Sequence, residues 1–252
     1  MRAVLTYHSI DASGSPVSVH PEAFARHVAF LAGGRVKVVP FESLPQVPEG
    51  EEAVALTFDD GFLNLAEFAW PLLRDAGLPA TVFAVTEHVG GTNRWGGIDE
   101  PGIPALPLMD WDTLARVASE GLAIGSHTCS HARLPGLDDP SLAHELHASR
   151  ELLEARTGAA VRTFAYPYGD HDARTVEAAR AVYDAACTTE LSWLRPEDSD
   201  PLRLPRLDAY YLQAPGRLDA FGTPAFRRYV GGRALLRRVR RLARRALTGG
   251  HA

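Results

Sequence analysis

Asp59 and Asp60 follow directly after an apolar run, Ala53–Phe58, that predicts a buried strand. The two carboxylates can point at one site, where each disfavours the ionised form of the other. A bound cation would relieve that repulsion. Asp60-Gly61 is also a common turn signal, so the pair taken alone fits either a functional site or a simple turn.

Two histidines four positions apart, His127 and His131, occur in SHTCSH at 126–131, after a second strand predicted at Leu122–Gly125. On one turn of helix both imidazoles would face the same side and could reach one ion. Neutral imidazole nitrogens suit zinc and similar metals. A lone pair with this spacing is usually a surface feature. Combined with one aspartate it makes a three-ligand set that leaves a position open for water, as a catalytic metal site requires.

An aromatic segment, FAYPYG at 164–169, follows a third predicted strand, Val161–Ala165. Its residues Tyr166, Pro167 and Tyr168 have the aromatic character that suits contact with a sugar ring. The alternative is an aromatic loop that packs on the rim of the fold. The sequence therefore places three segments with chemical potential at three predicted strand ends.

The elements that must position these segments alternate between strands and helices, which indicates an α/β domain with a parallel sheet. Seven or eight such units favour one distorted (β/α) barrel of about seven strands, with a basic C-terminal helix. In such barrels the chemistry lies at the C-terminal ends of the strands. The predicted strands are Ala3–Tyr7, Val36–Val39, Ala53–Phe58, Ala80–Val85, Leu122–Gly125, Val161–Ala165 and Ala185–Thr188, and the predicted helices are Pro21–Ala32, Leu63–Ala76, Asp110–Glu120, Asp139–Arg156 and Ala173–Val182.

The segments TFDDG, SHTCSH and FAYPYG, in this order and spacing, resemble the three leading motifs of the polysaccharide deacetylase family, whose domain is also called the chitooligosaccharide deacetylase domain. The resemblance covers about residues 3–210 and includes Glu145, Ser149 and Leu153 within the helix predicted at Asp139–Arg156. The three motifs together are highly specific, although each alone is not. The resemblance implies a barrel that removes acetyl groups from amino-sugar glycans with the help of a metal.

Position by position, the resemblance implies that Asp60, His127 and His131 hold zinc or another divalent metal such as Ni²⁺, Co²⁺ or Mn²⁺. It implies that Asp59 is the general base that takes a proton from the attacking water. The metal would lower the pKa of that water and polarise the acetamide carbonyl. The backbone N–H near Tyr168 would stabilise the oxyanion.

Two positions depart from the family pattern. Many members carry an arginine two residues before the proline of the third motif, and this chain has Ala165 there. We predict that Arg206 supplies the guanidinium from another strand end, against the alternative of a surface ion pair. The family's late Leu-x-x-His motif, which provides the general acid, is missing. His8, at the end of the first predicted strand, is the best-placed substitute, against an alternative role in the core or at the rim.

Trp95 lies in a Gly- and Pro-rich stretch, Gly90–Pro107, that predicts a long loop. Loops of this length without secondary structure are often functional. Trp95 could cover the site and contact substrate, or it could pack on the rim.

The composition indicates a globular chain with a sizeable core, because 46% of the 252 residues are hydrophobic and 23% are charged. Two cysteines are too few for a disulfide framework, and we expect free thiols in a reducing compartment. The first ten residues lack the apolar region of a secretory signal. No stretch approaches the roughly 20 apolar residues of a spanning helix. A cytoplasmic location is therefore expected.

The formal charge of −5 combines an acidic body with a basic tail. Residues 1–226 hold 17 basic and 31 acidic residues, whereas 227–252 hold nine arginines and no acidic residue. An acidic body argues against nucleic-acid binding.

We divide the chain into a catalytic domain at 1–222 and a tail at 223–252. Within 234–247, apolar residues recur at helical spacing among arginines, which is typical of a helix on an anionic membrane. That would place the protein at the inner membrane face. The alternative is docking on the acidic body.

Three functions are compatible with the sequence. They are hydrolysis of an N-acetyl group on an amino sugar, hydrolysis of another non-peptide C–N bond at the same metal, and glycan binding without catalysis. The missing general acid and Ala165 favour the third. Retention of Asp59 together with all three predicted ligands argues against it. The sequence predicts a metal-dependent N-deacetylase acting on an amino-sugar glycan or glycan precursor.

Overall fold

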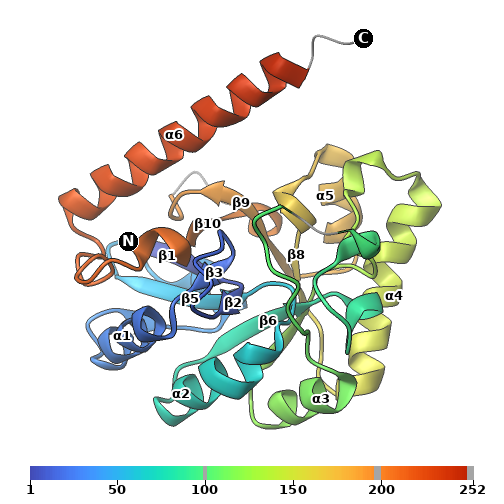
Figure 1. Cartoon of the computed structure of the whole chain (residues 1–252), viewed down its shortest axis with the longest axis horizontal. Helices are drawn as coiled ribbons and strands as arrows, with labels where there is room; N and C mark the ends of the chain where they lie inside the picture. Colours follow the sequence, from blue (N-terminus) through green and yellow to red (C-terminus); the bar gives the residue numbers. More distant parts are fainter. Residues whose placement is uncertain (99–100, 196–199, 249–252) are drawn as a thin grey trace.

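The computed structural model describes residues 1–98, 101–195 and 200–248, with side chains as far as Arg240. Within these residues seven parallel strands form the centre of the molecule (Figure 1). They are β1 (Arg2–Tyr7), β5 (Ala53–Phe58), β6 (Ala80–Ala84), β7 (Ala123–Ser126), β8 (Thr163–Ala165), β9 (Ala185–Leu191) and β10 (Leu204–Asp208).

The seven strands close into a barrel. Their order is β1-β10-β9-β8-β7-β6-β5, and β1 pairs in turn with β5 from Arg2↔Ala53 to Tyr7↔Phe58. A short strand, β4 (Lys37–Val38), pairs beside the beginning of β5. The predicted distorted (β/α) barrel of about seven strands is therefore confirmed.

Helices surround this barrel and begin where the sequence provides capping groups. The side chains of Asp110, Asp138 and Asp172 each accept a hydrogen bond from a backbone N–H in the first turn of the helix that follows, which satisfies donors that a helix start leaves unpaired. The helices are α1 (Pro21–Ala32), α2 (Trp70–Asp75), α3 (Trp111–Ser119), α4 (Asp139–Thr157), α5 (Ala173–Arg180) and α6 (Pro224–Thr248).

The barrel interior is filled by a small apolar cluster that includes Val4, Ala55, Phe83 and Ala165, each 0% exposed. Small side chains on neighbouring strands leave room for the ring of Phe83. The larger cluster lies between the strands and the surrounding helices. Because side chains fill the interior, the barrel has no open pore, and packed residues support the site at the C-terminal strand ends.

The observed elements differ from the predicted ones in one helix and in three strands. The helix predicted at Leu63–Ala76 is helical without a break from Leu63 to Asp75, but its part at Leu65–Ala69 is a π-helix that leads directly into α2. The strand β10 was not among the predicted elements, nor were β2 (Ser9–Ile10) and β3 (Ser18–Val19), which form a separate two-stranded sheet.

The C-terminal helix α6 begins ten residues before the apolar and arginine pattern that starts at Ala234. Its first half packs on the barrel, where Phe226 and Val230 are buried. Its second half projects from the body (Figure 1). The predicted pattern beyond Arg240 lies outside the described side chains, and 249–252 lie outside the described residues. Within the described part of the chain, no helix combines the length and apolar character needed to cross a bilayer.

Candidate active site

Asp60, His127 and His131 converge at the C-terminal ends of β5 and β7. The Nε2 atoms of His127 and His131 lie 3.5 and 3.6 Å from Asp60 Oδ1, and one donor atom from each residue lies within 4.8 Å of the others. Zinc bonds of about 2.0–2.2 Å in a tetrahedron place ligand atoms about 3.4 Å apart. The observed spacing is too long for hydrogen bonds and fits three ligands around one divalent ion.

The two histidines differ in how their second ring nitrogen is used. His127 Nδ1 lies 2.7 Å from the Ala165 carbonyl oxygen, which orients the ring so that Nε2 faces Asp60. His131 Nδ1 is buried without a hydrogen-bond partner. Desolvation, with a smaller effect of His127, lowers the pKa of His131 to about 2. His131 is therefore neutral at physiological pH, the form in which imidazole binds metals.

The segment that joins these histidines is not the helical turn expected from their spacing. Thr128 and His131 have φ angles of 71° and 62°, and the segment between β7 and Leu134 has no helical structure. The Thr128 hydroxyl accepts a hydrogen bond from the His131 N–H at 2.9 Å. That expectation of a helical turn was wrong, because local hydrogen bonds impose a tight loop that brings both rings to Asp60.

Glu145 of α4 holds this loop from behind. Its carboxylate accepts hydrogen bonds from the N–H groups of Cys129 and Ser130, at 2.7 and 3.0 Å, and from the Ser130 hydroxyl at 2.5 Å. One turn further, the Ser149 hydroxyl lies 2.7 Å from that of Ser126. The sequence marked Glu145 and Ser149 only through the family resemblance. Their positions four apart on one helix are a signal that both face the same neighbour.

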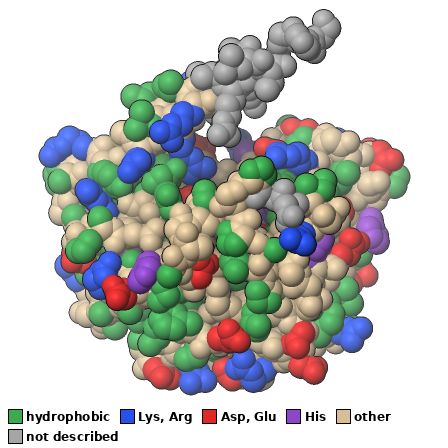
Figure 2. All heavy atoms as spheres, viewed as in Figure 1, with side chains coloured by type: hydrophobic (Ala, Val, Ile, Leu, Met, Phe, Trp, Pro, Cys, Tyr) green, Lys and Arg blue, Asp and Glu red, His purple; other side chains and the backbone are tan. Residues whose placement is uncertain are grey.

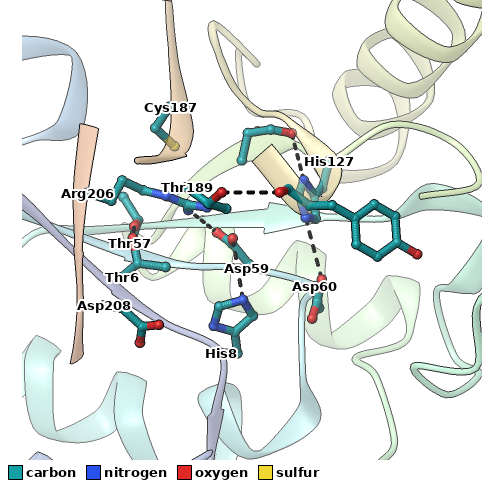
Figure 3. A network of polar contacts seen from close by, with 12 residues as sticks. Thr6, His8, Thr57, Asp59, Asp60, His127, Cys187, Thr189, Arg206 and Asp208 are labelled. Atoms are coloured by element: carbon teal, nitrogen blue, oxygen red, sulfur yellow. Dashed lines mark hydrogen bonds and ion pairs between the residues drawn. The ribbon is translucent and has the colours of Figure 1, made fainter. Parts of the chain in front are cut away.

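Asp59 lies beside the ligand set and is paired with Arg206 from β10. Arg206 Nη1 donates to Asp59 Oδ1 at 2.7 Å (Figure 3). Its Nε donates to the Thr188 carbonyl at 2.7 Å. Both side chains are almost fully buried. Burial raises the pKa of Asp59, but the charge of Arg206, with His8 and His127, more than reverses this and holds it well below its usual range.

His8, at the end of β1, approaches the other oxygen of Asp59. Its Nε2 lies 3.6 Å from Asp59 Oδ2, and its side chain is 26% exposed. Figure 3 shows Arg206 and His8 on two sides of the Asp59 carboxylate. Burial raises the pKa of Asp60, and the nearby histidines only partly oppose this. The two adjacent aspartates therefore have opposite pKa shifts, which is typical of carboxylates with different roles.

Two aromatic side chains pack against the buried ring of His131. The Trp95 ring stacks on it at 4.3 Å, and the Tyr168 ring contacts it edge-on at 4.5 Å. Tyr166 and Pro167, predicted with Tyr168 to bind substrate, are buried. The Tyr166 ring is 0% exposed and packs on Phe164 and His171. Of the predicted substrate contacts, Trp95 and Tyr168 are therefore the accessible ones.

Backbone strain is concentrated at this site. Among the described residues, the non-glycine residues with positive φ are Asp60, Thr128, His131 and Tyr168. All four belong to the three segments that the sequence singled out. Such conformations cost of order 1–3 kcal/mol each and persist where the surroundings over-determine them, often at functional sites.

The fold and the site define the class as a parallel (β/α) barrel. At the C-terminal ends of its strands lie two histidines and one aspartate that could hold a metal ion, beside a second aspartate that pairs with an arginine. The chain belongs to the polysaccharide deacetylase family, because the model of that family matches residues 46–183, which include all three motifs.

Individual relatives agree with this assignment. YxkH of Bacillus subtilis (strain 168), which is named for the same family, is 27% identical over 193 residues, 74% of this chain and 64% of YxkH. The chain thus spans less than two thirds of that relative. The structure of BC0361, a polysaccharide deacetylase from Bacillus cereus, aligns with a TM-score of 0.67 and 26% identity over 82% of this chain and 64% of that chain. The Streptococcus pyogenes deacetylase PplD, in complex with acetate, shares the fold, with a TM-score of 0.67 at 20% identity over 82% and 91%.

Proposed function

We propose that this protein hydrolyses N-acetyl groups on an amino-sugar glycan or glycan precursor and releases acetate. The observation that supports this most is the buried Asp59, ionised by Arg206 and adjacent to the set of Asp60, His127 and His131. A base beside a cation site is the arrangement that amide hydrolysis requires. Family membership supports the same reaction class.

We assign Asp60, His127 and His131 as ligands of a divalent metal, with zinc favoured by two nitrogen donors and one carboxylate. Ni²⁺, Co²⁺ and Mn²⁺ suit the same donors. The fit rests on the spacing of 3.5 and 3.6 Å between the two Nε2 atoms and Asp60 Oδ1. When bound, the metal would supply Lewis-acid polarisation of the acetamide carbonyl and a lowered pKa for the attacking water.

Side chains and backbone groups of this protein carry out the proton transfer and the charge stabilisation of the proposed hydrolysis. Asp59 accepts a proton from the attacking water as the water oxygen adds to the carbonyl carbon of the acetamide. Arg206 keeps Asp59 ionised and fixes its orientation through the second bond to Thr188. The Tyr168 N–H is the proposed donor to the oxyanion. The left-handed conformation of Tyr168 (φ 59°) sets the direction of that N–H.

His8 is the proposed donor of the proton to the leaving nitrogen. It is the histidine on the opposite side of Asp59 from Arg206, and its partial exposure lets it reach a bound substrate. As the C–N bond breaks, the amine takes this proton and acetate departs. A site that provides both a base and an acid disfavours the function of glycan binding without catalysis.

Trp95 and Tyr168 are the proposed contacts to the sugar. Together with His131 they form an aromatic surface beside the ligands, and the flat faces of such rings suit a sugar ring. Arg133 lies over the Tyr168 ring at 3.9 Å, which restrains that side chain before substrate arrives.

The C-terminal helix α6 is the proposed contact with an anionic membrane. Leu235, Leu236 and Val239 are 63%, 52% and 54% exposed, and Figure 2 shows hydrophobic and basic side chains together along the described part of α6. Each arginine near an anionic surface contributes about 1 kcal/mol. This partner would place the protein at the cytoplasmic membrane face.

The direction of α6 relates this membrane contact to the active site. Arg227 lines the same hollow as Met1 and Arg2 at the beginning of β1, whereas Arg237 lies 3.9 Å from Asp208 at the end of β10. The helix therefore runs from the N-terminal to the C-terminal ends of the strands. Its projecting half lies at the end of the barrel that holds Asp59, which favours a lipid-linked amino sugar as substrate.

Acetate release tests the activity. The metal-loaded chain and its Asp59→Asn variant are incubated with N-acetylated oligosaccharides, UDP-N-acetyl sugars and lipid-linked N-acetyl sugars, with and without a chelator. We expect chelator-sensitive release that Asp59→Asn abolishes without losing the metal. If the wild-type protein holds its metal but releases no acetate, the N-deacetylase proposal is wrong, and hydrolysis of another C–N bond becomes the assigned reaction.

Liposome flotation tests the membrane contact. Replacing Leu235, Leu236 and Val239 by serine should reduce binding to anionic vesicles and leave acetate release from soluble substrates unchanged. Equal flotation of wild-type and triple variant would refute the contact.

A further inference from the structure

A second group of metal-binding side chains lies behind the loop of His127 and His131. A carboxylate oxygen of Glu87, the thiol sulfur of Cys129 and a ring nitrogen of His144 all lie within 4.8 Å of one another. Cys129 is 4% exposed, whereas Glu87 and His144 are exposed. None of these three residues has a part in the proposed deacetylation.

Three different segments supply these donors, and backbone contacts hold the segments together. Glu87 lies in a 3₁₀ turn, Thr86–His88, and its N–H donates to the Cys129 carbonyl at 2.9 Å. His144 lies in α4, and its carbonyl oxygen is 3.9 Å from the Cys129 sulfur. The donors are therefore placed by the packed part of the fold, and only the ends of the Glu87 and His144 side chains need to move to close on an ion.

A buried polar atom beside the thiol lacks a partner. The Thr86 hydroxyl is 4% exposed and has no hydrogen-bond partner. The Thr86 N–H donates to the carbonyl of Thr128, the neighbour of Cys129, at 3.2 Å. Buried polar groups are nearly always paired, so each exception needs an explanation. A hydroxyl at this position could donate a hydrogen bond to the Cys129 thiolate after a bound metal has displaced the thiol proton.

We propose that Glu87, Cys129 and His144 form a second cation site, selective for thiophilic divalent ions such as Zn²⁺ and Cd²⁺. A sulfur, a nitrogen and an oxygen donor suit these ions, whereas Mg²⁺ and Ca²⁺ prefer oxygen alone. Binding replaces the thiol proton, which leaves to solvent, and the exposed Glu87 and His144 provide the route from solution. The site does not depend on the proposed function.

The site would connect the surface to the catalytic ligands. Cys129 lies midway between His127 and His131, and an ion bound to its sulfur would link their loop to α4 and to the turn at Thr86–His88. His88 also contacts Trp95, the ring that stacks on His131. Occupancy of the second site is thus coupled through two routes to the position of His131.

Cadmium titration of the metal-stripped full chain tests the proposal. Cd²⁺ bound to a thiolate produces an ultraviolet charge-transfer band, and equilibrium dialysis counts the bound ions. We expect a band that is absent in Cys129→Ala, and one bound Cd²⁺ per chain fewer in that variant than in the wild type. The band should persist in Asp60→Asn, which impairs only the first site.

Exposed variants keep the test valid if Cys129→Ala fails to fold. Removing an outer partner of a metal ligand typically weakens binding about 10–100-fold, so Glu87→Gln and His144→Gln, which remove direct ligands, should weaken the thiolate-linked site by about 100-fold. His147→Gln, which changes an exposed histidine on the same helix, is the matched control and should have no effect. Wild-type protein without a band, or equal affinity in His144→Gln and His147→Gln, would overturn the proposal.

Discussion

Replacing Arg206 by methionine removes the positive charge that pairs with the buried carboxylate of Asp59. The Arg206 and Asp59 side chains are 4% and 3% exposed, and the two are joined by a hydrogen bond of 2.7 Å. Removing one partner of a buried ion pair typically costs about 3–5 kcal/mol, because the remaining charge is left uncompensated. Methionine retains much of the apolar volume, so we expect a loss of about 3–5 kcal/mol at pH 7 with little contribution from a cavity.

The pH dependence of this loss follows from the pKa of Asp59. In the wild type its folded pKa is depressed, so the pair stabilises the protein above the unfolded pKa of about 3.9. That contribution disappears as the pH falls through the lower, folded pKa. In Arg206→Met, burial acts without the guanidinium and raises the pKa of Asp59 above its unfolded value. The penalty in the variant therefore grows as pH rises and shrinks toward pH 4.

Urea unfolding of the metal-free chain at pH 7 and pH 4 measures both effects. Asp59→Asn provides the control background. There the buried Arg206 cation already lacks its partner, so Arg206→Met should be neutral or stabilising, apart from about 1 kcal/mol for the lost hydrogen bond to Thr188. An equal loss in the two backgrounds, or a loss that does not change with pH, would refute the role assigned to Arg206.

Three further substitutions test other parts of the site. Glu145→Gln removes a charged acceptor of three loop hydrogen bonds, and zinc affinity measured by chelator competition should fall about 10–100-fold. His8→Gln should slow amide hydrolysis about 10²–10⁴-fold but spare 4-nitrophenyl acetate, whose leaving group needs no proton; equal losses on both would contradict an acid role. Gly169→Ala places a Cβ 2.1 Å from Thr189 Oγ1 at φ 71° and should lower the Tm, whereas Gly136→Ala, in open space, should not.

Much of the barrel was predictable because each strand is a short apolar run bounded by turn signals. Ala53–Phe58 was predicted with its observed bounds, as was α1 at Pro21–Ala32. The strand β10 was harder, because proline is unfavourable within a sheet and LPRLD contains one. Arg206 was nevertheless singled out, since Ala165 left the family's usual arginine position without a charge.

The shape of the loop that carries His127 and His131 could not be predicted from its residues. Thr128 is β-branched, and a positive φ is unfavourable for such residues, so local preference argues against the conformation observed. Tertiary contacts with Glu145 outweigh that preference. The early start of α6 was missed for a related reason: Gly231 and Gly232 interrupt the helical pattern, while Phe226 and Val230 bury enough apolar surface to hold the first half in place.

The strained residues also explain why the site is formed before substrate binds. The left-handed conformations of Asp60, Thr128 and His131 cost of order 1–3 kcal/mol each, and the network that compensates for them is internal. Glu145 accepts three hydrogen bonds from the ligand loop, and Thr128 accepts one from His131. In the proposed deacetylation, donor atoms held in this way would need little reorganisation when charge develops at the reacting carbonyl. A substitution that relaxes Thr128 would therefore ease the backbone and loosen His131 in the same step, so stability and function are opposed at that residue.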